Sequence, residues 1–248
     1  MDKLIQTLIS GLSLGSIYAL IALGYTMVYG IAKMLNFAHG DIIMVGAYAV
    51  ITAVFTMGLP PFIAILISIA LCALLGIVIE FLAYRPLRQA QPLAVLITAI
   101  GVSYLLQNLA LLIYGSEQKA FPTIVALPTV HIGGVYIDGI TLATLVVTAV
   151  IMVALSLFIN KTRMGKAMRA VSEDKEAAEL MGISVNRTIT VTFAIGSALA
   201  GVAAIFYGAA YTYIRPTTGA MPGIKAFTAA VFGGIGSIPG AMLGGILL

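Results

Sequence analysis

Charge is the scarcest property of this 248-residue chain. Asp, Glu, Lys and Arg together make up 9% of the residues, whereas hydrophobic residues make up 61%. Soluble domains contain about 25% charged residues, and a globular protein needs a charged shell that this chain cannot supply. The composition therefore excludes an ordinary soluble domain. It indicates apolar segments of about 20 residues that cross a lipid bilayer.

Residues that carry chemistry are also few. The chain has one cysteine, two histidines and no tryptophan. Cys72 lies inside an apolar run, so no disulfide or metal framework is expected, and no nucleophile is spaced to pair with a base. The net charge of +4 is divided among short loops between apolar runs, which is typical of membrane topology and not of nucleic-acid binding. An enzyme or a nucleic-acid-binding protein is therefore not expected.

The apolar runs predict an all-α polytopic membrane protein with about eight transmembrane or re-entrant helical segments, as one domain over residues 1–248. Six spans are expected at about residues 4–35, 42–57, 60–84, 92–114, 140–159 and 188–213. After Pro216 the chain is rich in glycine and its apolar pieces are short. This pattern indicates a pair of half-helices, which a membrane tolerates only where protein or water satisfies the backbone.

The first and last apolar runs have unusual lengths. A straight helix over 4–35 would be about 48 Å long against a hydrocarbon core of about 30 Å, so we expect it to tilt, project or break, with Gly24 and Gly30 as the weak points. Gly11, Gly15 and Ala19 form a stripe of small residues that favours close helix packing. Residues 241–248 stop in the middle of an apolar run, so we expect the natural C-terminus to lie further on.

Lysine and arginine predict the orientation of the spans. The loops at 85–88 and 161–187 hold eight of the 13 basic residues, which places both on the cytoplasmic side. Two spans separate these loops, in agreement with a shared side. The segment 115–139 and the N-terminus are then expected on the opposite side.

The segment 161–187 is a polar island that holds ten of the 22 charged residues. Its basic front half is expected to continue the fifth helix past the lipid as far as Arg169. Ser172 is a favourable N-cap for a new helix, Glu173 places negative charge in its first turn, and Gly182 is a natural end. The sequence predicts a short cytoplasmic helix of about nine residues over 173–182. It either docks into a groove of another protein or is an ordinary solvated connector.

The island also contains the triplet Glu176-Ala177-Ala178, followed by Gly182. This pattern resembles the loop by which permeases of ABC importers dock on their ATPase subunit. The isoleucine and the Leu-Pro pair that this loop usually carries further on are absent, and Thr192 stands about where the isoleucine would be. Glu-Ala-Ala triplets are common in helices. The position of this one, in a cytoplasmic loop between two spans, strengthens the resemblance.

Further segments resemble the permease subunits of branched-chain (leucine/isoleucine/valine) amino acid importers. These segments are GLSLGSIYAL (11–20), LNFAHGD (35–41), MRAVSED (168–174) and FGGIGSIPG (232–240). The resemblance implies a single permease domain in the inner membrane of a bacterium. It also implies three kinds of partner: ABC ATPase subunits, a second permease subunit that is homologous or identical, and a periplasmic substrate-binding protein. Ser172, Glu173, Glu176, Ala177, Ala178 and Gly182 would then couple the permease to the ATPase.

The chain agrees with this assembly because it has no phosphate-binding loop of the form Gly-x-x-x-x-Gly-Lys-Ser/Thr. We expect no cofactor in this chain and ATP hydrolysis on a partner. Nucleotide-driven movement of the 173–182 helix would switch the spans between outward-open and inward-open states.

Polar residues near or inside spans are candidates for the translocation path, because such groups are costly in lipid unless they are solvated or paired. Asn36, His39 and Asp41 precede the second span, and Gln107 and Asn108 lie inside the fourth. The alternatives are that Asn36 or Asp41 caps the second helix, that His39 bonds to a loop, and that Gln107 and Asn108 only join helices. Glu80 is expected to pair with Arg85 or Arg88.

Other transport classes remain open. An importer of the same class could carry urea, short amides or sugars. A channel could also contain broken helices, but it would not need the capped cytoplasmic helix. A secondary transporter would need an acid at mid-depth for ion coupling, and Asp41 and Glu80 both lie near span ends.

Overall fold

The computed structural model describes residues 2–124, 128–132 and 135–248, and this part of the chain is mostly helical. Six of its helices are long and apolar enough to cross a membrane. They are α1 (Asp2–Ala32), α2 (His39–Ile51, extended by a π-helical turn at Thr52–Thr56), α3 (Pro61–Ile79, extended by a π-helical turn at Glu80–Tyr84), α4 (Pro92–Tyr114), α5 (Gly139–Lys161) and α8 (Val185–Tyr211). The predicted all-α membrane architecture is confirmed.

Shorter elements complete the molecule. The glycine-rich end forms the predicted pair of short helices, α9 (Ala220–Phe232) and α10 (Ile238–Leu247), so the long and short segments together match the expected eight. The polar island forms α6 (Arg163–Glu173) and α7 (Lys175–Leu180). Two small antiparallel sheets pair β1 (Lys119–Ala120) with β4 (Tyr213–Ile214) and β2 (Val130–Ile132) with β3 (Val135–Ile137). They lie in and beside the polar segment 115–139, which the structure describes except at 125–127 and 133–134.

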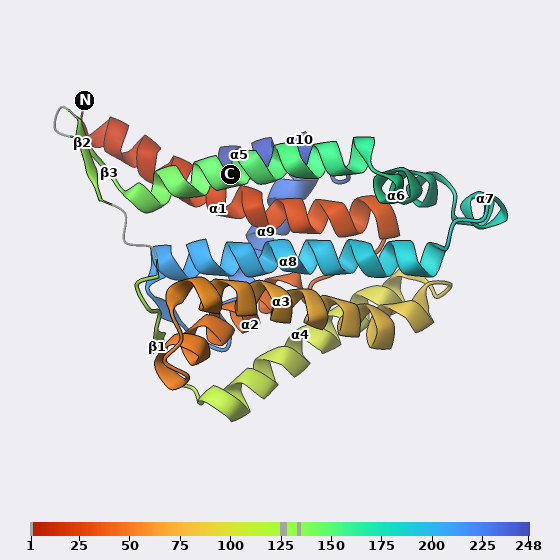
Figure 1. The fold of residues 1–248 in the computed structure, drawn as a ribbon, viewed down its shortest axis with the longest axis horizontal. Helices are drawn as coiled ribbons and strands as arrows, with labels where there is room; N and C mark the ends of the chain where they lie inside the picture. The colour runs from red at the N-terminus through yellow and green to blue at the C-terminus, as the bar shows by residue number, and fades with distance from the viewer. Residues whose placement is uncertain (1, 125–127, 133–134) are drawn as a thin grey trace.

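The two ends of the helix bundle differ. At one end, the N-terminal turns of α1 meet the β2–β3 hairpin, where the side chain of Gln6 donates to the Tyr136 carbonyl at 2.9 Å. At the other end lie α6 and α7, together with the contact between the side chains of Arg88 and Asn186. Figure 1 shows this separation, with the strands at the left and α6 and α7 at the right. The two basic loops therefore share one end, as predicted.

The first helix does not break, which leaves tilting or projection of the three expected outcomes. It is one unbroken helix of 31 residues, about 46 Å long, so it exceeds the hydrocarbon core without breaking at Gly24 or Gly30. These glycines are instead points of close approach. A Cβ atom on Gly24 would lie 2.5 Å from Nε2 of His39, and one on Gly30 would lie 3.0 Å from the Cα of Gly236.

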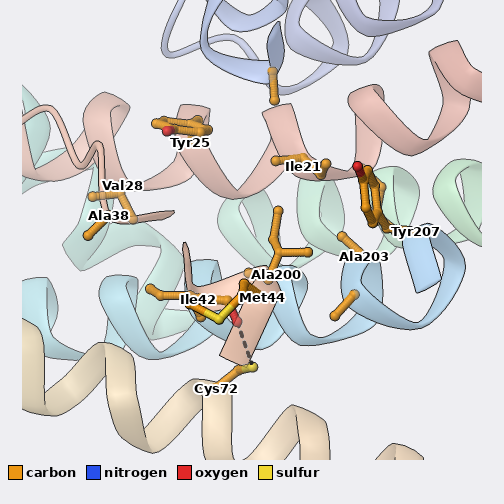
Figure 2. Packing of buried hydrophobic residues seen from close by; sticks show 14 of the residues in the cluster. Ile21, Tyr25, Val28, Ala38, Ile42, Met44, Cys72, Ala200, Ala203 and Tyr207 are labelled. Atoms are coloured by element: carbon orange, nitrogen blue, oxygen red, sulfur yellow. Dashed lines mark hydrogen bonds between the residues drawn. The ribbon is translucent and has the colours of Figure 1, made fainter. Parts of the chain in front are cut away.

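The core of the bundle surrounds α2, which packs against α1, α3 and α8 (Figure 2). Gly46 allows α3 to approach α2 closely, because a Cβ atom there would lie 2.8 Å from Sγ of Cys72. Cys72 of α3 is a buried free thiol whose Sγ lies 3.5 Å from the Ile42 carbonyl, and Ser68 one turn earlier donates to the Gly46 carbonyl at 2.9 Å. Figure 2 shows Ala200 and Ala203 of α8 facing the same space.

The predicted stripe of small residues on α1 forms a helix interface over part of its length. A Cβ atom on Gly245 of α10 would lie 2.3 Å from the Cα of Ala19, and one on Gly15 would lie 2.9 Å from the Ile246 carbonyl. Gly11 contributes nothing to this interface, because a Cβ atom there would have no described atom within 4 Å. The short helix α10 thus packs against α1 backbone to backbone.

Candidate translocation path and coupling segment

The second span begins inside the bundle rather than at its surface. Helix α1 ends at Ala32, Lys33 adopts a left-handed backbone conformation (φ +58°), and residues 34–38 run without helix until α2 begins at His39. His39 lies against Gly24, which precedes Ala32 by eight residues, or about 12 Å along α1. The segment 33–38 therefore carries the chain back into the bundle. Helix α2 begins there, at a depth where α1 is still helical.

The polar residues of this segment are buried. Asn36, His39 and Asp41 are exposed by 2%, 0% and 1%. Tyr84 donates to the side-chain oxygen of Asn36 at 3.0 Å, while the Asn36 amide nitrogen has no partner among the described residues. Helix α2 has Ala38 at its N-cap, without a side-chain hydrogen bond. Neither Asn36 nor Asp41 caps it, so that alternative is wrong.

His39 packs on an aromatic side chain of α1. Its ring lies edge-on to Tyr25, with 4.7 Å between the ring centroids. Neither ring nitrogen makes a well-formed hydrogen bond within the described chain, although the ring interacts with the Ile21 carbonyl, and the Tyr25 hydroxyl is also without a partner. Tyr25, Asn36 and His39 therefore form a group of buried polar side chains with unused hydrogen-bonding capacity.

Asp41 joins α2 to α4. Its carboxylate accepts from the Ser103 hydroxyl and, at 3.0 Å, from the side-chain amide of Gln107. Asn108 does not join them, because it lies on the exposed side of α4 and its amide donates to the Tyr104 carbonyl at 2.7 Å. The structure therefore brings Gln107 to Asp41 and leaves Asn108 on the outside of the bundle.

The short helix α9 meets the start of α2. A Cβ atom on Gly40 would lie 2.2 Å from the Gly219 carbonyl oxygen and 2.9 Å from the Cα of Gly223. The N-terminal ends of α2 and α9 therefore abut within the bundle with no side chain between them. Each end carries a partial positive charge from its free N–H groups. Transporters use such half-helix ends to bind anionic groups of their substrates.

The polar island is divided differently from the prediction. Helix α5 ends at Lys161, and Thr162 adopts an extended conformation whose side chain accepts from the Gly165 N–H at 3.0 Å. The fifth helix therefore does not continue to Arg169, because Thr162 caps a separate helix, α6. That helix buries Met168 and Val171 against the bundle.

The next helix also begins later than predicted. Ser172 and Glu173 belong to α6, and the Ser172 hydroxyl donates back to the Arg169 carbonyl at 2.7 Å. Asp174 is the N-cap of α7, since its Oδ1 accepts from the N–H groups of Glu176 and Ala177 at 2.9 and 3.0 Å. The helix has six residues instead of about nine. Gly182 ends it as expected, with φ +81°.

Helix α7 lies at the far end of the bundle and exposes an apolar tip. Ala178 is buried, whereas Glu176 and Ala177 are exposed. Leu180 and Met181 are 89% and 83% exposed, although large apolar side chains favour burial. The start of the helix is tied to the bundle, because Lys175 Nζ donates to the carbonyl of Ala32, the last residue of α1, at 3.1 Å.

A model of the protein family described as "branched-chain amino acid transport system / permease component" matches residues 7–248. The chain belongs to this family. It is 48% identical to the high-affinity branched-chain amino acid transport system permease protein BraD of Pseudomonas aeruginosa, and 44% identical to LivH of Escherichia coli, which carries the same description. Each alignment covers 98% of this chain and 83% of the relative. The fructose import permease protein FruG of Bifidobacterium longum is 26% identical over 90% of the chain. No solved structure matches.

Membership of this family identifies the protein as a transport permease and not an enzyme. Its six candidate spans make it a multi-pass membrane protein. The permease also contains one buried ion pair within its described residues, in which Arg88 bonds to Glu80. Arg85, the alternative partner, instead lies over the Phe81 ring, 5.4 Å from its centroid.

Several residues at these sites escaped the sequence-based prediction. Tyr25 and Ser103 lie in apolar runs where nothing marks them as polar partners, and Lys175 lies among other charged residues. Asp174 carried a usable signal in the sequence, because Asp is one of the residues preferred at the N-cap of a helix. Ser172 carried the same signal two residues earlier.

Proposed function

We propose that the permease is the membrane subunit of an ATP-driven importer for branched-chain amino acids. The observation that carries this proposal is the 48% and 44% identity, over 98% of the chain, to permeases of high-affinity branched-chain amino acid systems. The sugar permease FruG is much less similar, at 26%. This difference favours leucine, isoleucine and valine over sugars. No observation favours urea or short amides.

The assembly that this function requires contains subunits of other kinds. The permease has no phosphate-binding loop, so ATP binds to separate ABC ATPase subunits and this chain needs no cofactor. A second permease subunit completes the path, and a periplasmic binding protein delivers the substrate. The complex then lies in the inner membrane of a bacterium, with the α6–α7 end in the cytoplasm, because that end holds the basic loops.

The substrate path passes the junction of α2 and α9. An amino acid is a zwitterion, so its path needs groups of both polarities. The abutting N-terminal ends of α2 and α9 favour the carboxylate, and the Asp41 carboxylate favours the ammonium group. Tyr25, Asn36 and His39 have unused hydrogen-bonding capacity beside this junction. The surrounding core is apolar and suits a leucine side chain.

The coupling step runs from α7 to this junction. Leu180 and Met181 form an apolar knob of a size that suits a groove on an ATPase subunit. Movement of α7 is transmitted through the bond between Lys175 and Ala32 to the end of α1. The next residues, 33–38, lead directly into the start of α2, so a shift of α1 displaces the polar junction.

Transport in proteoliposomes tests the proposed substrate. The complete complex, with its ATPases, second permease and binding protein, should take up radiolabelled leucine only when ATP is enclosed. Isoleucine and valine should compete, whereas urea, acetamide and fructose should not. Uptake without ATP would indicate a channel, and competition by fructose or urea in place of the amino acids would assign a different substrate.

The coupling role is tested with Glu176→Lys and Gly182→Leu. At φ +81° any residue with a Cβ is strained by about 1–2 kcal/mol, although no described atom blocks the side chain. Both variants should hydrolyse ATP with little uptake. Glu117→Lys makes the same charge change on an exposed residue at the opposite end and serves as the control. Full uptake in both α7 variants would contradict the coupling role.

A further inference from the structure

A basic hollow lies beside the coupling segment. It has a volume of about 350 Å³, and it is lined by the end of α1, the segment 87–90 and the start of α4. Three cationic side chains line it, those of Lys33, Arg88 and Lys175. These residues are far apart in the sequence, so only the tertiary structure assembles the cluster.

The positive charge of the hollow is only partly compensated. Glu80 bonds to Arg88, and this is the one ion pair between residues that the structure describes. Lys175 donates to a neutral carbonyl, that of Ala32. Glu173, Asp174 and Glu176 line a neighbouring hollow with Lys33 and Lys175, but none of these described carboxylates lies within ion-pair distance of either lysine. Of the three cations, only Arg88 has a described carboxylate within ion-pair distance.

The cluster has the properties of an anion-binding site. Burial, together with repulsion from Arg88 and Lys33, lowers the pKa of Lys175 below its ordinary value. A bound anion would relieve this repulsion and raise the pKa again. The Nε atom of Arg88 is buried without a hydrogen-bond partner in the described chain, so the guanidinium retains a donor for the anion.

The surface next to the hollow indicates what kind of anion fits. Pro92, Val95 and Leu96 of α4 form its apolar wall. Leu93 and Ile97 continue this apolar surface outside the hollow and are 63% and 59% exposed. A ligand that contacts both regions has an anionic head and a hydrocarbon tail. Basic pockets between helices on the cytoplasmic side of a membrane favour anionic lipid headgroups.

We propose that Lys33, Arg88 and Lys175 bind the phosphate headgroup of an anionic phospholipid whose acyl chains lie along α4. The headgroup then lies between the last turn of α1 and the first residue of α7. It stabilises the contact through which α7 moves α1, so transport depends on anionic lipid. Lipid binding does not depend on which substrate the permease carries, but its effect on transport rests on the proposed coupling role of α7.

The test measures lipid retention by the complete purified transporter in native mass spectrometry. Lys33→Asn removes one charge and keeps the left-handed backbone, which asparagine tolerates. Lys175→Gln removes a second. Arg88 is left in place, because its loss would strand the buried Glu80. Lys161→Gln removes an exposed charge from the end of α5 and is the matched control.

A positive charge near a membrane surface contributes about 1 kcal/mol to the binding of an anionic lipid, which corresponds to about fivefold in affinity. We expect each lysine variant to weaken retention of phosphatidylglycerol about fivefold and the double variant about 30-fold. The control should match the wild type, and phosphatidylcholine should be retained weakly by all.

Three results would overturn the proposal. The first is a lack of specificity, seen either as equal retention of phosphatidylglycerol and phosphatidylcholine by the wild type or as unchanged retention of phosphatidylglycerol by the double variant. The second is loss of ATPase subunits from the double variant while phosphatidylglycerol stays bound, because the lysines would then contact protein carboxylates. The third is displacement of the lipid by an equimolar amount of inorganic phosphate, because the site would then bind free phosphate without need of acyl chains.

Discussion

The N-cap of the coupling helix offers a direct test of how α7 is held. Asp174→Ala removes both hydrogen bonds that Oδ1 accepts, at 2.9 and 3.0 Å. Replacing an Asp N-cap with Ala costs about 1 kcal/mol, which lowers the population of the ordered helix relative to the disordered segment about fivefold. A helix of six residues has few other local interactions to compensate.

The assay compares leucine uptake with ATP hydrolysis in proteoliposomes that contain the complete transporter. We expect Asp174→Ala to lower the uptake per ATP by at most about fivefold, while the thermal stability of the membrane bundle changes little because α7 is not one of the spans. Asp174→Asn should behave like the wild type, since asparagine caps a helix about as well as aspartate. Ser172→Ala should also have little effect, because the Ser172 hydroxyl bonds only within α6.

Three outcomes would refute this reasoning. Wild-type coupling in Asp174→Ala would show that the cap does not hold α7. Defective coupling in Ser172→Ala, with normal coupling in Asp174→Ala, would return the N-cap to the position that the sequence predicted. If Asp174→Asn fails as badly as Asp174→Ala, the negative charge matters and the capping bond does not.

Close packing, the buried ion pair and the polar junction each give a further prediction. Gly245→Ala would force a Cβ to within 2.3 Å of the α1 backbone and should cost about 1–3 kcal/mol, seen as a lower melting temperature in detergent. Gly101→Ala should not lower the melting temperature, because a Cβ atom at Gly101 would have no described atom beyond its own helix backbone within 4 Å. Glu80→Gln leaves Arg88 buried without its counter-charge and should cost about 3 kcal/mol, and the double variant with Arg88→Gln should recover most of the melting temperature. Asp41→Asn should fold normally but take up leucine about tenfold more slowly, because a charge-assisted hydrogen bond of about 1.5 kcal/mol to the substrate is lost.

The course of the spans was largely predictable, and the contacts between them were not. The fourth span was predicted at its observed bounds, Pro92–Tyr114, because proline and glycine mark its ends. Within it, Gln107 contacts Asp41 while Asn108 is exposed. Successive residues point about 100° apart around a helix, so only one of the two can face α2. The span is apolar on every side, and no periodicity shows which face is turned inward.

The choice between the two candidate N-caps of α7 also depended on the tertiary structure. Ser172 and Asp174 both favour an N-cap position, and the sequence could not rank them. The packing of α6 determines which residue is the N-cap. Because α6 buries Met168 and Val171 in the bundle, it stays helical as far as Glu173, and α7 can begin only after it. Gly24 and Gly30 show the same effect in α1, since they accommodate His39 and Gly236 and do not break the helix.

Composition and local pattern were enough to establish the membrane class, the number of helical segments, the shared side of the basic loops and the polar island between two spans. These properties are local, because about 20 apolar residues are needed to cross a bilayer wherever they occur. The folded arrangement was needed to show that the second span starts inside the bundle, that it meets α9 glycine to glycine, and that Lys33, Arg88 and Lys175 line one hollow. Those contacts join residues distant in the chain, and they depend on how each helix is rotated and how closely its backbone approaches the next.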